Sequence, residues 1–214
     1  MLLPSVEDRF FRHPELLIAE VSALQPSIKY IVIDEIQKAP KLLEVVHHLI
    51  EKSPRLFAMT GSSARKLRHG GANLLAGRAF TKHLFPLTSK ELGSQFVLDD
   101  VLRWGSLPKI YQLDSAERKD DFLFAYANSY LKEEIQAEQL VRRIDHFRKF
   151  LEVAAQSNGL LINFSNIARD TGMDGKTVRS YYEILEDTLV GFWLEPFQTS
   201  VRKRLKQSPK FYFF

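Results

Sequence analysis

Residues 30–40 read YIVIDEIQKAP, and this stretch decides the fold class. Its first four residues form a continuous apolar run that is rich in β-branched side chains. Such a run is typical of a strand that is buried on both faces of a parallel sheet. Asp34 and Glu35 follow the run directly, and Pro40 is suited to the first turn of a helix. The stretch therefore predicts a buried strand that ends in two acids and leads into a helix.

The sequence on either side of this stretch continues the same α/β pattern. A helix is expected at about residues 41–52, and a second buried strand is expected at 56–59. Strand, helix and strand at this spacing form a right-handed unit of a parallel sheet. We further expect a helix at about 14–24 and a third strand at 83–85. The N-terminal part is thus predicted to be an α/β domain with a parallel sheet.

After Pro86 the sequence pattern changes from strands to helices. Ser165 is suited to cap the start of one short helix, and strands are expected over residues 189–197 and 210–214. The order of these elements is that of a winged helix-turn-helix: a helix, a short helix, a glycine-containing turn, a longer helix and a strand. The expected helices cover about residues 118–139, 146–157, 164–168 and 174–187.

The composition is that of an ordinary globular protein, and it excludes several classes. Of the 214 residues, 45% are hydrophobic and 26% are charged, which excludes collagen, coiled coil and disorder. The absence of cysteine excludes disulfide scaffolds, cysteine zinc sites and thiol catalysis. The apolar runs are too short to span a bilayer, and the first residues do not read as a signal peptide. We therefore expect a cytoplasmic protein without a membrane partner.

Positive charge is concentrated in two stretches, although the formal net charge is only +4. Residues 52–90 contain eight Lys or Arg and no acid, and residues 196–214 contain five Lys or Arg and no acid. Segregated charge of this kind indicates an anionic partner, such as phosphate or nucleic acid, or else two solvated basic faces.

Asp34 and Glu35 fit the Walker B pattern, in which an apolar strand ends in two acids. The C-terminal ends of strands are where open α/β sheets bind ligands. Asp34 would hold Mg²⁺, mostly through water, because Mg²⁺ loses its hydration shell reluctantly. Glu35 would orient and deprotonate an attacking water. The alternative is a strand end with two solvated acids.

The second strand adds polar residues at the same edge of the expected sheet. Residues 56–63 read LFAMTGSS, which puts Thr60 and Ser62 at the end of that strand. A hydroxyl there can contact a γ-phosphate or the water beside Glu35. Arg78 follows within the first basic stretch, where an arginine can stabilise phosphoryl charge. A surface or inter-domain arginine is the alternative.

The blocks DEIQK, TGSS and AGR occur in this order, and WGSLPKIYQ, NSYLKEEI and SPKFYFF follow them. In these blocks the chain resembles the prokaryotic AAA-type ATPases that carry a C-terminal domain of unknown function. The resemblance implies a P-loop ATPase core that uses ATP and Mg²⁺. It implies that Asp34 binds Mg²⁺ and that Glu35 is the catalytic base. Thr60 or Ser62 would be the sensor at the strand end, and Arg78 would be the phosphate-sensing arginine.

The sequence departs from this family at the P-loop. A GxxxxGK[ST] segment should precede the strand at 30–33, and no such segment is found. Gly175-Lys176-Thr177 looks like the end of a P-loop, but the position five residues before Gly175 is Asp170 rather than glycine. We therefore expect a fragment of a longer ATPase with an incomplete parallel sheet. The chain alone is expected neither to hydrolyse ATP nor to bind a cofactor tightly.

The C-terminal helices provide a competing site for nucleic acid. Lys176 and Arg179 lie near the start of the longer helix of the winged-helix-like segment, the part that enters a major groove in DNA-binding versions. Arg202, Lys203 and Arg204 of the basic tail could contact phosphates. Against this, the same helix carries more acids than bases, and packing or protein contact is the alternative. A nucleic-acid-binding module and a non-catalytic interaction protein therefore both stay open as functions.

These expectations combine into three parts of the chain. Residues 1–90 are expected to form a partial AAA-type ATPase core, 91–140 a helical lid or linker, and 141–214 a winged-helix-like domain with the start of a C-terminal domain. The predicted fold class is an α/β N-terminal part followed by a helical region and a winged-helix domain. The expected partners are a nucleotide, if a P-loop is supplied, and DNA or a protein at the winged helix.

Overall fold

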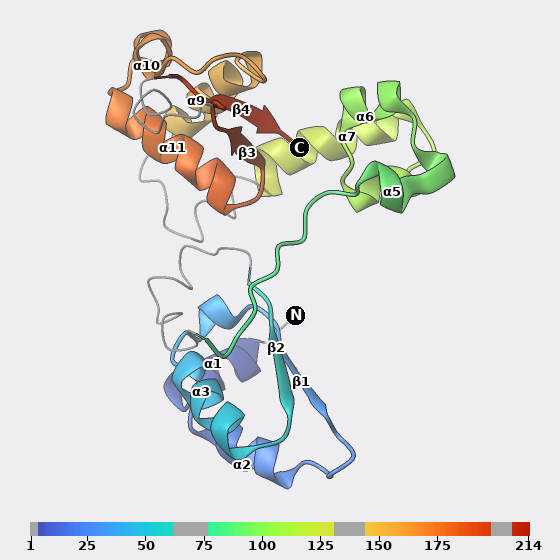
Figure 1. Ribbon diagram of the computed structural model, residues 1–214, viewed down its shortest axis with the longest axis vertical. Coiled ribbons are helices and arrows are strands. Elements are labelled where there is room, and N and C mark those ends of the chain that lie inside the picture. The colour runs from blue at the N-terminus through green and yellow to red at the C-terminus, as the bar shows by residue number, and fades with distance from the viewer. Residues whose placement is uncertain (1–3, 62–76, 131–143, 198–206) are drawn as a thin grey trace. The chain divides into compact units, whose positions relative to one another are not determined.

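The computed structural model describes residues 4–61, 77–130, 144–197 and 207–214, and Figure 1 shows their course. The chain divides into two compact units, Met1–Lys82 and His83–Phe214. Each unit contains its own cluster of buried apolar side chains. Within the described ranges, no helix combines the length and the apolar character that are needed to cross a membrane.

The N-terminal unit is an α/β arrangement around two parallel strands. The pairing register joins Tyr30 to Leu56 and Ile33 to Met59, so both predicted strands are confirmed at their expected positions. The helix expected between them is also confirmed. The elements in chain order are α1 (Pro4–Arg12), α2 (Leu16–Ala23), β1 (Tyr30–Ile33), the 3₁₀ turn η1 (Ile36–Lys38), α3 (Leu42–Lys52) and β2 (Leu56–Met59).

One face of the β1–β2 pair carries the core of this unit. Ile33 is buried, and Phe57 and Met59 pack against the same cluster. Helices α2 and α3 supply most of the other buried members of the cluster, Ile36 and Ala39 at η1 supply two more, and Figure 1 shows both helices beside the strand pair. Burial of this face is favourable because it removes apolar surface from water. The buried helix residues are Leu17, Val21, Leu42, Leu43, Val46 and Leu49.

The opposite face of the strand pair is open, and the prediction of strands buried on both faces is wrong for the described residues. The side chains of Tyr30 and Val32 are each 68% exposed, and Leu56 is 59% exposed. Successive side chains of a strand point to opposite faces, so these residues share the face that α2 and α3 leave uncovered. An all-parallel sheet normally has a layer on each face, and the described residues supply only one.

The third strand expected at residues 83–85 is also wrong, because the structure has no strand there. A strand is defined by hydrogen bonds to a neighbour, and among the described residues no strand lies beside this segment. The apolar side chains of the segment are largely exposed, with Leu84 91% and Phe85 51% exposed. An apolar sequence alone is therefore not sufficient for a strand here.

Short helices open the C-terminal unit. The long helix expected at 118–139 begins at Ala116 and changes to a π-helix at Tyr126, and its remainder lies outside the described residues. Ser115 caps its start by accepting a hydrogen bond from the backbone N–H of Arg118 at 3.3 Å. The elements are α5 (Ser89–Leu92), η3 (Gly93–Gln95), α6 (Leu98–Trp104), η4 (Pro108–Gln112), α7 (Ala116–Ala125) and η5 (Tyr126–Tyr130).

Three helices and two antiparallel strands complete this unit. The expected cap of the second of these helices, Ser165, is wrong: the cap is Asn163, whose side-chain oxygen accepts hydrogen bonds from the backbone N–H groups of Ser165 and Asn166 at 3.0 and 3.1 Å. Asp174 caps the third helix in the same way. The elements are α9 (Ile144–Gln156), α10 (Phe164–Thr171), α11 (Gly175–Asp187), β3 (Gly191–Leu194) and β4 (Lys210–Phe213).

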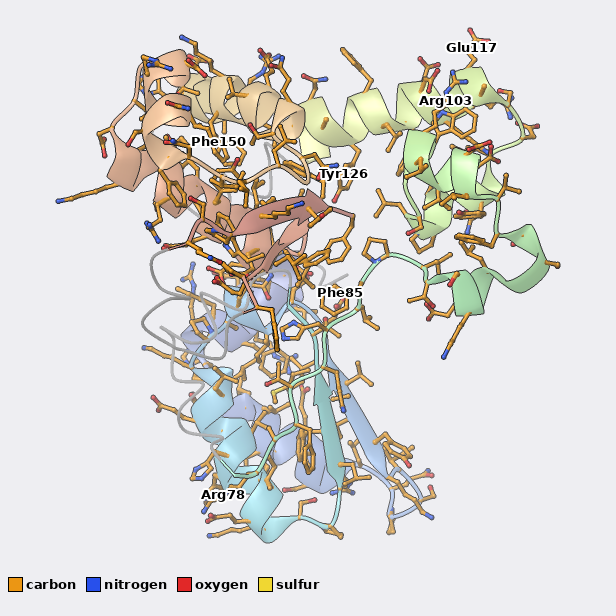
Figure 2. The ribbon with its side chains drawn as sticks, turned by 45° about the horizontal axis from the view of Figure 1, so that its top comes forward. Arg78, Phe85, Arg103, Glu117, Tyr126 and Phe150 are labelled. Carbon is orange, nitrogen blue, oxygen red and sulfur yellow. The ribbon has the colours of Figure 1, made fainter. Side chains whose placement is uncertain are left out.

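Tyr182 of α11 occupies the middle of the C-terminal core. Its side chain is fully buried, and its ring centroid lies 4.9 Å from those of Phe150 and Phe211 and 5.0 Å from that of Trp193. Figure 2 labels Phe150 among the helices that surround this core. The pairs with Phe150 and Phe211 are edge-to-face, and such pairs add to the stability that burial provides. The Tyr182 hydroxyl has no hydrogen-bond partner among the described residues, and burial raises its pKa.

We predict that Tyr182→Phe stabilises the C-terminal unit by about 1 kcal/mol, because it removes a buried hydroxyl that forms no hydrogen bond. Tyr182→Ala should destabilise the same unit by about 3–5 kcal/mol, because it leaves a cavity among the rings. Urea unfolding followed by aromatic circular dichroism measures both changes. Tyr212→Phe serves as the control at a less buried tyrosine. A loss of stability in Tyr182→Phe would contradict the prediction.

Candidate functional site

The parallel pairing of β1 and β2 brings the predicted acids and the predicted sensor together. Asp34 and Glu35 follow the end of β1, and Thr60 follows the end of β2. The backbone N–H of Thr60 donates to the carbonyl of Ile33 at 3.0 Å, and the carbonyl of Thr60 accepts from the N–H of Ile36 at 3.0 Å. These bonds continue the sheet ladder beyond the strands and fix the two strand ends to each other.

The Thr60 hydroxyl connects both acidic positions. Its Oγ1 donates a hydrogen bond to Oδ1 of Asp34 and accepts one from the backbone N–H of Glu35 at 3.3 Å. The hydrogen bond from Thr60 is the main cause that lowers the pKa of Asp34 from its ordinary value of 3.8. Asp34 therefore stays ionised at neutral pH, and its side chain is exposed to solvent. The pair presents a carboxylate and a hydroxyl side by side at the edge of the sheet.

Glu35 has a left-handed backbone conformation, with φ of 60° and ψ of 44°. Residues with a side chain adopt this conformation infrequently, and it costs about 1–3 kcal/mol where the surroundings impose it. Here the bonds from Thr60 and the buried side chain of Ile36, which is 1% exposed, hold the turn in place. Strain of this kind is concentrated at functional sites in proteins, which supports a functional interpretation of this turn.

Gln37 contacts the side-chain carboxylate of Glu35, and the sequence pattern does not indicate this contact. Its Nε2 donates to Oε2 of Glu35 at 3.0 Å, and its side chain is only 8% exposed. A glutamine in a short polar stretch gives no signal of burial by itself. Its position two residues after Glu35, inside the DEIQK block, was the available sign.

The donor set at the strand ends suits Mg²⁺ but is incomplete for a nucleotide. Mg²⁺ prefers oxygen ligands and is held in phosphoryl-transfer sites by one or two carboxylates, water and substrate phosphates. Asp34 and Thr60 provide such oxygens at an accessible position. The described residues contain no cluster of three or more acidic, histidine or cysteine side chains that could hold a metal by themselves. Asp34 could therefore hold the ion only together with water and phosphate.

One predicted residue, Arg78, lies away from this site, and another, Ser62, cannot be placed. Arg78 forms an ion pair with Glu51 at 2.8 Å, and Figure 2 shows it beside α3. Glu51 lies in the last turn of α3, and this helix runs from the end of β1 back to the start of β2. Arg78 is thus at the edge of the sheet opposite to Asp34, and its role in phosphate sensing stays a prediction. Ser62 lies outside the described residues.

A second candidate site lies at the start of α11. An open depression of about 650 Å³ is lined by both cations predicted there, Lys176 and Arg179. Arg179 places its guanidinium over the ring of Phe164, 4.4 Å from the centroid. Asp174 also lines the depression, but it is engaged as the helix cap, and its hydrogen bond with the Thr177 hydroxyl is the first of the causes that lower its pKa. Within the described part of the chain, neither cation is neutralised by a carboxylate.

The basic tail belongs to this second prediction but cannot be placed. Arg202, Lys203 and Arg204 lie outside the described residues. The predicted nucleic-acid contact is therefore represented in the structure by Lys176 and Arg179 alone.

Comparisons with known proteins divide the chain at nearly the same place as its two units. Residues 4–93 match an AAA domain, and residues 95–214 match a domain of unknown function, DUF8612. The N-terminal match supports an AAA-type, ATPase-like domain. The comparison with solved structures found no match.

Three bacterial proteins resemble the chain. Uncharacterised proteins of Mycobacterium tuberculosis and Mycobacterium bovis are each 30% identical to it over 203 residues, which is 93% of this chain and 44% of theirs. An uncharacterised protein of Haemophilus influenzae is 24% identical over 199 residues, which is 86% of this chain and 50% of that protein. The chain therefore spans half or less of the length of these relatives.

We predict that Thr60→Val raises the pKa of Asp34 toward its ordinary value, because the hydroxyl that stabilises the carboxylate is removed. A lowered pKa in the folded state stabilises the protein above the unfolded pKa, and this contribution is lost as the pH falls through the folded pKa. The variant should therefore be less stable than the wild type at neutral pH, and the difference should shrink in acid. Carbon-13 NMR titration of the Asp34 carboxyl measures the shift directly.

Thr60→Ser is the matched control, because it keeps the hydroxyl and should keep the low pKa of Asp34. An unchanged Asp34 titration in Thr60→Val would show that the hydroxyl does not determine the charge state of this acid.

Proposed function

The chain belongs to the family of the domain of unknown function DUF8612, and we propose that it is part of an AAA-type protein that binds and hydrolyses ATP. The observation that carries this proposal is the cluster of Asp34, Glu35 and Thr60 at the ends of two neighbouring parallel strands. Ligands of open α/β sheets bind at this edge. Glu35 has a strained backbone, and Asp34 is held by the Thr60 hydroxyl. These features favour a hydrolytic site over the alternative of two solvated acids at a strand end.

Each residue of this cluster has a distinct role in the proposal. Asp34 stays ionised and holds the Mg²⁺ of an ATP complex, mostly through water. Mg²⁺ neutralises negative charge on the phosphates when it is bound. Glu35 orients a water for in-line attack and accepts its proton. Thr60 fixes the spacing of the two acids and reports on the γ-phosphate at the end of β2.

The proposal also includes an explanation of the open sheet. The sequence contains no GxxxxGK[ST] segment, so it lacks the backbone cradle that binds phosphates in P-loop proteins. The exposed side chains of Tyr30, Val32 and Leu56 have the apolar character of a sheet face that is covered in a larger assembly. We propose that the P-loop comes from a segment outside this sequence and that the chain alone does not turn over ATP.

The test compares ATP hydrolysis by the 214-residue chain with hydrolysis by a version extended with a strand, a GxxxxGK[ST] loop and a helix. We expect turnover only in the extended protein. In that protein Glu35→Gln should lower kcat by about 10²–10⁴-fold, the usual contribution of a general base. Glu44→Gln, an exposed acid on α3, is the matched control and should leave kcat unchanged.

Two results would remove this proposal. One is an extended protein that folds but neither binds nor hydrolyses ATP. The other is an equal loss of kcat in Glu35→Gln and Glu44→Gln, because a general base cannot share its effect with an acid elsewhere on the surface.

A second function, binding of nucleic acid, is favoured by the depression at the start of α11. The order of α9, α10, α11 and the β3–β4 hairpin matches the winged helix-turn-helix that we propose for this region. Lys176 and Arg179 are the exposed cations at the helix start that would contact phosphates in a groove. The acids of the same helix count against this role, and a protein contact is the alternative partner.

We predict that binding to a short DNA duplex weakens as salt rises. Reversal of both charges, in Lys176→Glu with Arg179→Glu, should reduce the slope of log K against log salt by about 2, because two phosphate contacts are lost. Lys109→Glu is the control at an exposed lysine of η4. Binding that does not depend on salt, or an equal effect of Lys109→Glu, would exclude this site.

A further inference from the structure

Gln37 is the buried polar side chain closest in sequence to the acids of the candidate site. It belongs to the 3₁₀ turn η1, and its side chain is 8% exposed, between Ile36 at 1% and Ala39 at 2%. Its Nε2 donates to Oε2 of Glu35 at 3.0 Å. A buried amide is costly unless it is hydrogen-bonded, so the contact with Glu35 is part of what makes this burial tolerable.

The backbone holds Gln37 and Glu35 in this relation. The left-handed conformation of Glu35 turns the chain sharply after β1, and the N–H of Lys38 donates to the Glu35 carbonyl at 2.9 Å. Thr60 binds the N–H groups of Glu35 and Ile36 from the neighbouring strand. The backbone of the turn is therefore fixed at both ends. The Glu35 carboxylate could still rotate, and a contact with a neighbouring side chain can prevent that rotation.

We infer that Gln37 is a positioning residue that fixes the carboxylate of Glu35 by occupying its Oε2. The other oxygen, Oε1, is then the atom that accepts a proton from water, and the amide determines the direction in which it points. This inference rests on the proposed function for the role of Glu35 as a base, but the contact itself is a property of the chain without nucleotide. A general base must lie within hydrogen-bond reach of its water, so a fixed orientation has a direct chemical use.

The contact can be tested in the 214-residue chain by exchanging donor and acceptor. The four proteins are the wild type, Glu35→Gln, Gln37→Glu and the double variant. At about pH 7, Gln37→Glu places two carboxylates together and should lower the Tm of the N-terminal unit by roughly 4–8 °C, a shift appropriate for a unit of this size. The double variant should be more stable than Gln37→Glu alone, because the amide introduced at position 35 then donates to the carboxylate introduced at position 37.

Non-additivity provides a readout that a space-filling role of Gln37 would not give. At about pH 7 the effects of the two substitutions on stability should be strongly non-additive, because the proposed contact joins the two positions.

Gln37→Glu combined with Glu44→Gln is the matched control, because it removes an acid that does not touch Gln37. Rescue by Glu35→Gln and not by Glu44→Gln would support the contact. Equal rescue by both, or additive effects of Glu35→Gln and Gln37→Glu, would overturn it.

A second arm separates this inference from the proposed function. In the version extended with a P-loop, Gln37→Leu should lower kcat about tenfold or more and leave KM unchanged, because a misdirected base affects the chemical step. Gln37→Asn, which keeps the amide, should be less impaired. Equal kcat in the wild type and Gln37→Leu would overturn the positioning role. Failure of the wild-type extended protein to turn over ATP would remove the proposed function, while the exchange experiment would still decide the contact.

Discussion

Four residue pairs join β1 to β2 in parallel register, and the candidate site is built on this pairing. The register puts Thr60 beside the end of β1, so that its N–H bonds to Ile33 and its carbonyl and hydroxyl bond to the turn that follows. A slip by one residue would reverse the faces of a strand. It would move Ile33 out of the core and separate the hydroxyl from Asp34. Packing of the sheet and chemistry of the site therefore depend on the same register.

The two units use burial differently. The core of the N-terminal unit lies on one side of its strand pair, and large apolar side chains of the other face remain in water. The core of the C-terminal unit surrounds an aromatic group with Tyr182, Phe150 and Phe211 fully or almost fully buried. In both units apolar burial is favourable because it removes apolar surface from water.

The sequence predicts much of this local structure and less of its context. The apolar runs give β1 and β2 at their observed positions, and the pair of acids and Thr60 follow from the strand ends. Features that depend on distant segments are missed. The run at 83–85 forms no strand among the described residues, because a strand needs a hydrogen-bonded neighbour. The exposure of Tyr30 could not be predicted either, because it depends on whether another layer covers that face of the strand pair. Gln37 is missed because its burial results from the fold of the turn.

The left-handed backbone of Glu35 also bears on how this position responds to selection. Glycine adopts that conformation without a steric cost, so glycine at position 35 would relax the turn and at the same time delete the carboxylate. Glu35→Gly would then rank high among variants compared by yield of folded protein and low among variants compared by catalytic activity. The glutamate at this position therefore provides its carboxylate at the cost of a less favourable backbone conformation.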